Sequence, residues 1–79
     1  MKLTKSQLDL LDALYEIGSF LPSDEHADDE RALLQAGLIR FKGGEEIALT
    51  SEGVEALMAD PERAEYWRKA EAEWMAGVA

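Results

Sequence analysis

Carboxylates are the side chains in this chain most able to do chemistry, and eight of the seventeen lie within residues 6–30. Asp24 and Asp28 stand four residues apart, a spacing that brings two side chains to one face of a helix. Two carboxylates placed together could act as a general acid and a general base. His26 lies between them, with Asp29 close by, and an imidazole among carboxylates could bind a metal ion.

The rest of the composition argues against catalysis and against a metal site. The chain has no cysteine and one histidine, so thiolate nucleophiles, cysteine-ligated zinc and paired-histidine sites are excluded. Gly43 and Gly44 lack the strand–glycine–helix context of a phosphate-binding loop. The motifs supply no nucleophile and no oxyanion donor. We therefore expect that the protein is not an enzyme and that it binds no metal and no cofactor. We interpret His26 as a surface residue.

Length and charge limit the class of protein and of partner. Seventy-nine residues with 47% apolar content predict one globular domain spanning residues 1–79. The net charge of −9 disfavours direct binding to nucleic acid or to an anionic membrane. This negative charge either favours binding to a basic partner or only keeps the protein in solution. The missing cysteine and the lack of a long apolar run at the start favour a cytoplasmic protein with no signal peptide or membrane span.

The negative charge is unevenly distributed along the chain. Residues 6–30 carry eight acids and no lysine or arginine, whereas residues 31–44 carry three bases and no acid. We expect these acids on the outer faces of the first two helices, with Glu30 among them. Such a surface is either an ordinary solvated helix face or a binding surface for a positively charged partner.

Residues typical of helix starts and helix ends show where the helices that position these side chains begin and stop. Thr4 and Gln7 have capping-box spacing, and Gly18 and Gly37 are placed to end helices. Asp60 and the following proline mark another helix start. We predict a mostly helical α+β domain with helices at about 5–17, 25–36, 51–58 and 61–75, and a β-hairpin at about 38–50.

The hairpin register follows from the apolar pattern. A three-residue loop at 43–45 places Lys42 opposite Glu46 and gathers the apolar side chains on the other face. This choice puts Glu45 at the usual left-handed position of the loop. The predicted core consists of Leu8, Leu11, Leu14, Leu33, Leu34, Leu38, Ile39, Phe41, Ile47, Leu49, Val54 and Leu57.

The middle of the chain resembles the winged helix-turn-helix family. Residues 33–39 (Leu-Leu-Gln-Ala-Gly-Leu-Ile) resemble the end of a recognition helix, and residues 49–57 contain the Leu-Thr-x-x-Gly-x-x-x-Leu stretch that opens the helix after the wing. The resemblance covers about residues 27–58 and implies a two-stranded wing carrying Arg40 and Lys42. Only residues 19–22 lie where the family has a complete helix, so we expect a trimmed winged helix. The segment at the recognition position begins with acids, which repel phosphates.

The first functional hypothesis is a small protein-binding module that docks on the basic surface of a nucleic-acid-binding partner. Its acidic surface is similar to that of phage-type DNA mimics, such as anti-CRISPR or anti-restriction inhibitors. The candidate contact residues are Asp9, Asp12, Glu16, Asp24, Glu25, Asp28 and Asp29.

Two alternatives remain open from the sequence. One is a winged-helix transcriptional regulator that binds DNA through Arg40 and Lys42, and that dimerises through Trp67 and Trp74. The other is a structural or assembly adaptor that uses the same tryptophans for docking. Because these tryptophans stand seven residues apart, they face the same way along a helix, as an interface or as part of the core.

Overall fold

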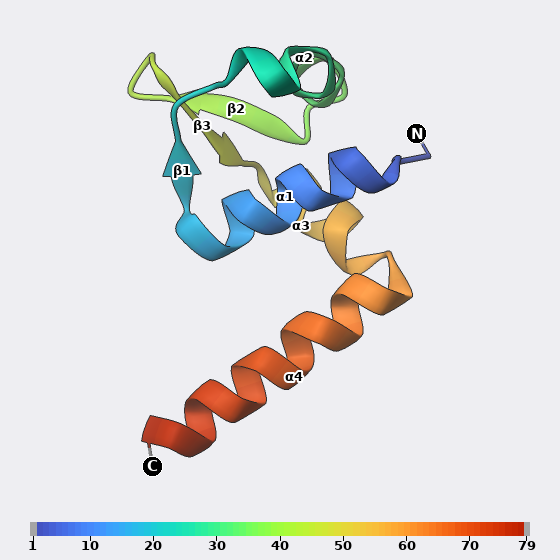
Figure 1. Ribbon diagram of the computed structural model, residues 1–79, viewed down its shortest axis with the longest axis vertical. Helices are drawn as coiled ribbons and strands as arrows, with labels where there is room; N and C mark the ends of the chain where they lie inside the picture. Colours follow the sequence, from blue (N-terminus) through green and yellow to red (C-terminus); the bar gives the residue numbers. More distant parts are fainter. Residues whose placement is uncertain (1, 79) are drawn as a thin grey trace.

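The structure is a computed structural model that describes residues 2–78, and its mostly helical α+β class is as predicted. Figure 1 shows the small sheet and α2 on one side of α1, and α3 and α4 on the other. In chain order the elements are α1 (Lys5–Ile17), β1 (Ser19–Phe20), the 3-10 helix η1 (Asp24–His26), α2 (Ala27–Gln35), β2 (Ile39–Lys42), β3 (Glu46–Leu49), α3 (Ser51–Met58) and α4 (Pro61–Val78).

Both ends of α1 are set by local sequence signals. The Thr4 hydroxyl accepts the Gln7 backbone N–H at 3.2 Å, and the Gln7 side chain accepts the Thr4 N–H at 2.9 Å. This reciprocal pair is the predicted capping box, and it satisfies N–H groups that a helix start leaves free. Gly18 ends the helix with a φ of 101°, and its N–H donates to the Leu14 carbonyl.

The second helix begins later than predicted and ends as predicted. The Ser23 hydroxyl accepts the Glu25 N–H, and this tight cap starts η1 rather than an α-helical turn. α2 follows at Ala27. At its other end Gly37 has a φ of 77°, and the Leu38 N–H donates to the Leu33 carbonyl at 3.0 Å. This is the six-to-one bond of a Schellman motif.

The sheet has three antiparallel strands in the order β1-β3-β2, so the predicted hairpin of β2 and β3 is present and a third strand that the prediction missed joins it. Ser19 and Phe20 pair with Ala48 and Ile47 on the free edge of β3. The short connector after α1 therefore adds a strand, and that strand covers an edge that would otherwise expose unpaired backbone groups.

The hairpin register is confirmed, with Lys42 opposite Glu46 and Phe41 opposite Ile47. The expectation for Glu45 was wrong. Among the described residues only glycines have positive φ, and in this loop they are Gly43 at 65° and Gly44 at 85°. The two glycines take the left-handed conformations, which cost a residue without a β-carbon little.

The core lies where α1, α2 and α3 meet the sheet. Its fully buried large side chains are Leu11, Leu14, Leu33, Ile47 and Leu57. Leu10 is also buried, although the prediction omitted it. Phe41 was predicted to be buried but is 51% exposed, because it lies beside the turn on the edge strand β2, whereas Ile47 lies on the central strand.

Thr50 joins the end of α2 to the start of α3. Its hydroxyl accepts the Gly53 N–H at 3.0 Å and donates to the Gly37 carbonyl at 2.6 Å. Its own N–H donates to the Leu38 carbonyl at 3.1 Å. A β-carbon on Gly53 would lie 2.0 Å from that same Leu38 carbonyl oxygen. α3 therefore approaches the backbone at Leu38 more closely than any residue other than glycine permits.

α4 leaves the rest of the molecule along its C-terminal half (Figure 1). The accessible surface of 5506 Å² exceeds the roughly 4,800 Å² expected for a folded chain of this mass. No helix within residues 2–78 combines the length and the apolar character needed to cross a bilayer.

Candidate functional site

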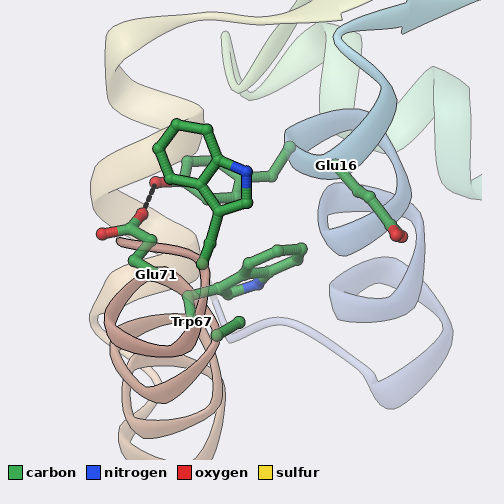
Figure 2. A pocket seen from close by; sticks show the side chains of 6 residues that line it. Glu16, Trp67 and Glu71 are labelled. Carbon is green, nitrogen blue, oxygen red and sulfur yellow. Dashed lines mark hydrogen bonds between the residues drawn. The ribbon is translucent and has the colours of Figure 1, made fainter. Parts of the chain in front are cut away.

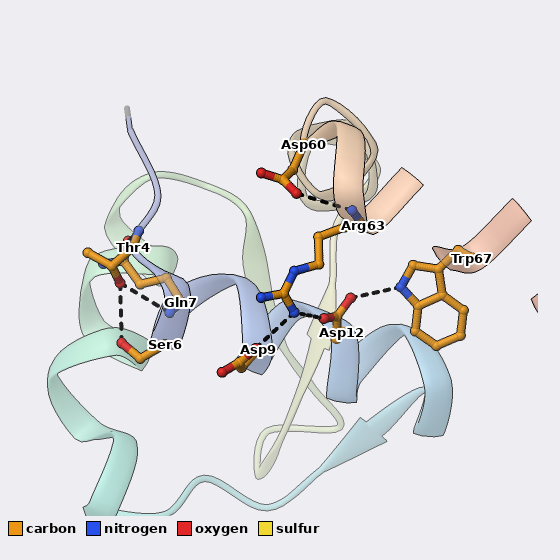
Figure 3. A network of polar contacts seen from close by, with 8 residues as sticks. All are labelled: Thr4, Ser6, Gln7, Asp9, Asp12, Asp60, Arg63 and Trp67. Atoms are coloured by element: carbon orange, nitrogen blue, oxygen red, sulfur yellow. Dashed lines mark hydrogen bonds and ion pairs between the residues drawn. The ribbon is translucent and has the colours of Figure 1, made fainter. Parts of the chain in front are cut away.

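Two of the seven candidate contact residues, Asp9 and Asp12, take part in an intramolecular network. Figure 3 shows Arg63 of α4 reaching to both carboxylates on α1. Its Nη1 lies 2.8 Å from Asp9 Oδ1 and also contacts Asp12 Oδ2. Arg63 is itself held at a helix start, because its backbone N–H donates to the Asp60 carboxylate at 3.1 Å.

Asp12 also joins this network to Trp67. The Trp67 Nε1 donates to Asp12 Oδ1 at 2.7 Å, so both oxygens of this carboxylate are engaged, and its side chain is 22% exposed. Hydrogen bonds to the two aspartates raise the pKa of Arg63 above its usual value, which keeps the guanidinium charged. Asp12 therefore fastens α4 to α1. The sequence pattern missed this pairing because the partners stand 51 and 55 residues apart.

The other five candidates remain available at the surface. Asp24, Glu25 and Asp28 are exposed and Asp29 is half-buried, all at the start of the η1–α2 segment. We call these four residues the acidic patch. Glu16, near the end of α1, is also exposed. Within residues 2–78 none of the five forms an ion pair. The N-terminal end of a helix carries partial positive charge and tolerates such acids.

Glu30 does not lie on the outer face with the patch, so that expectation was wrong. Its side chain is 6% exposed, and its Oε2 accepts the Ser23 backbone N–H at 3.0 Å. This carboxylate holds the segment before η1 against α2. Its burial was hidden from the sequence pattern because the partner is a backbone group seven residues earlier.

The residues of the alternative sites are spread over other surfaces. Arg40 and Lys42 are exposed on the edge strand β2, and Lys42 lies opposite Glu46. His26 is exposed between η1 and α2. In the described part of the chain, no three metal-ligating side chains come together.

Trp67 and Trp74 line one shallow groove of about 270 Å³ between α4 and α1 (Figure 2). Tyr15, Glu16, Ala70 and Glu71 complete its lining. The Tyr15 and Trp67 ring centroids lie 4.8 Å apart in an edge-to-face contact, and Trp67 packs against the core. Trp74 differs, since it is 67% exposed. One tryptophan thus builds the wall of the groove, and the other presents its ring to solvent.

A hydrogen bond fixes the phenol at one side of this groove. The Tyr15 hydroxyl donates to Glu71 Oε1 at 2.8 Å. This bond and the nearby carboxylate charge raise the pKa of Tyr15 above its usual value, because both favour the neutral phenol. At neutral pH the phenol keeps its proton and holds the Glu71 carboxylate beside the groove.

No family model matches the chain, and no curated protein or solved structure matches it. Two surfaces stand out from the geometry itself. One is the acidic patch, and the other is the groove, which we call the aromatic groove. Both suit noncovalent binding of positive groups.

Proposed function

We propose that this protein is a small binding module whose acidic patch docks on the basic, nucleic-acid-binding surface of a partner protein. In its sharpest form it is a phage-type inhibitor that occupies a DNA-binding channel by mimicry, within the cytoplasm. One observation carries the proposal. The four carboxylates of the patch fall within residues 24–29, three exposed and one half-buried, without ion-pair partners in the described chain, and Glu16 is exposed nearby in sequence.

The order of elements supports this interpretation. A helix, a hairpin and a further helix follow one another as in the winged helix-turn-helix family, which is the resemblance stated for residues 27–58. In a DNA-reading member the segment at η1–α2 would offer bases, amides and hydroxyls to the duplex. Here the same position offers carboxylates. A surface that repels phosphates attracts the groups that bind phosphates.

The pairing of Asp9 and Asp12 with Arg63 narrows the proposed contact set. Arg63 offsets one of their two negative charges and holds both side chains against α4, whereas no cation within the described residues pairs with the patch. The proposal therefore relies on Glu16 and the patch. Electrostatic complementarity of this kind speeds association and makes it sensitive to salt.

The proposal predicts that neutralising the patch weakens partner binding. The variant carries Asp24→Asn, Glu25→Gln, Asp28→Asn and Asp29→Asn together, and the assay is affinity capture from nuclease-treated host lysate, identified by mass spectrometry. We expect the wild-type chain to retain a basic nucleic-acid-binding protein that leaves as salt is raised. The variant should bind that protein at least about tenfold more weakly, a loss of about 1.4 kcal/mol.

A matched control removes the same number of charges elsewhere. It replaces four exposed glutamates outside the patch, Glu45, Glu55, Glu62 and Glu73, with glutamine. This control should keep the partner, and circular dichroism should show both variants folded. Equal binding by the wild type and the patch variant would contradict the proposal, and so would an equal loss in the two variants.

The exposure of Arg40 and Lys42 on an edge strand favours one second candidate, a winged-helix regulator that binds DNA directly. It predicts salt-sensitive binding of the purified chain to duplex DNA, lost when both residues are replaced by alanine. In the capture assay it predicts DNA-bound proteins only before nuclease treatment.

A further inference from the structure

We infer that the aromatic groove binds the guanidinium group of an arginine side chain on a basic partner protein. Three aromatic side chains and two carboxylates line it, and a groove of this composition matches a flat organic cation in both shape and charge. The inference deepens the proposed function and rests on it for the identity of the partner. The groove itself can be tested without that partner.

The walls of the groove are held in place before any ligand arrives. The Trp67 indole N–H is committed to Asp12, and the Tyr15 hydroxyl is committed to Glu71. The Asp12 bond orients the Trp67 indole, and the edge-to-face contact with Trp67 holds the Tyr15 ring, so that little side-chain freedom remains to be lost on binding. Trp74 is the exposed ring of the set, and it offers a face on which a guanidinium could stack.

Carboxylates lie at the edges of the groove. In the view of Figure 2, the Glu16 and Glu71 carboxylates lie on opposite sides of the Trp67 indole. Glu71 uses one oxygen for the Tyr15 hydroxyl, whereas Glu16 forms no ion pair within residues 2–78. A guanidinium presents several N–H donors in its plane while its face stacks on a ring, so it can use ring and carboxylate together.

Charge also decides between an arginine-bearing partner and a second copy of this chain. Each copy carries a net charge of −9, so two copies brought together would repel each other. Two glutamates line the groove and, among the described residues, no cation does, although α4 elsewhere exposes Arg68 and Lys69, of which Lys69 pairs with Glu65. A positive side chain is complementary to this surface, and an acidic copy is not.

The test is a titration of the full ¹⁵N-labelled chain, followed by NMR at the two tryptophan indole N–H signals. The signals are assigned with Trp74→Phe. The probe is N-acetyl-arginine amide, and N-acetyl-citrulline amide serves as its neutral isostere. We expect the arginine compound to shift the Trp74 signal saturably below about 0.1 M, and we expect the citrulline compound to give no saturation.

Four variants separate stacking from simple attraction, and the Trp67 signal follows binding in each. Trp74→Leu keeps an apolar side chain without a ring and should weaken binding about two- to fivefold, whereas Trp74→Phe should largely retain it. Because Trp74 is mostly exposed, both variants should fold. Glu16→Gln should also weaken binding. Glu73→Gln, which removes a charge from α4 outside the groove lining, should leave it unchanged.

Three results would overturn the inference: a linear response to the arginine compound, an equal response to the citrulline compound, or unchanged affinity in Trp74→Leu. The neutralised-patch variant keeps this experiment separate from the proposed function. Saturable arginine binding in that variant, with partner capture lost, supports both. If the variant binds arginine saturably and still captures the partner as the wild type does, the inference about the groove is supported and the proposed function is contradicted.

Discussion

Replacing Gly53 with alanine is expected to destabilise the fold by about 3 kcal/mol or more. The new β-carbon would lie 2.0 Å from the Leu38 carbonyl oxygen and 3.1 Å from a Leu49 methyl group. That carbonyl also accepts the Thr50 N–H, so relief of the clash requires α3 to move away from the bonds that start it. Alanine favours helix over glycine by up to about 1 kcal/mol, which is too little to offset the clash.

Urea unfolding followed by circular dichroism measures this loss. A domain of this size has a total stability of about 4–12 kcal/mol, so the variant should unfold at much lower urea or lose its structure in water. Gly77→Ala is the matched control, because it lies in α4 and its added β-carbon meets nothing within 4 Å. That control should be neutral or slightly stabilising. Equal urea midpoints for the two variants would contradict the close approach at Gly53.

Replacing Asp12 with alanine is expected to cost about 2 kcal/mol and to loosen α4 from α1. The change leaves the Trp67 indole N–H without its acceptor and removes one of the two carboxylates that hold Arg63. Both losses occur in a partly buried network, where hydrogen bonds to charged groups are stronger than at the surface. The Trp67 indole N–H signal should move, and the urea midpoint should fall.

Asp9→Ala is the control for this network. Asp9 contacts the same arginine, but its side chain is 56% exposed and it makes no bond to Trp67. Its replacement should cost less than about 1 kcal/mol, as for other exposed ion pairs. An unmoved Trp67 signal in Asp12→Ala, or equal costs for the two aspartates, would show that Asp12 does not fasten the helix.

Local signals predicted most of the fold. The capping box at Thr4, the glycine stop at Gly37 and the hairpin register at Lys42 each depend on residues close in sequence, so their geometry could be derived from spacing alone. The third strand could not, because two residues at Ser19 and Phe20 carry no periodic pattern. They become a strand only because β3 offers them a free edge.

The candidate site was predicted less completely, for the same reason. The abundance of acids between residues 6 and 30 is a matter of composition, but their separate roles depend on contacts distant in sequence. Asp12 meets Arg63 and Trp67 across more than 50 residues, and Glu30 turns inward to a backbone N–H. The spacing of the tryptophans placed them on one side of a helix. It gave no sign that Tyr15 and Glu16 would complete a groove with them.

The central claim is that this chain and nucleic acid compete for the same basic surface. The most direct measurement takes the purified captured partner bound to labelled duplex DNA and adds this chain, with fluorescence anisotropy as the readout. The account predicts that the chain displaces the DNA, that displacement weakens as salt rises, and that the neutralised-patch variant fails to displace it. A ternary complex of partner, DNA and this chain, or DNA binding by this chain alone, would contradict the account.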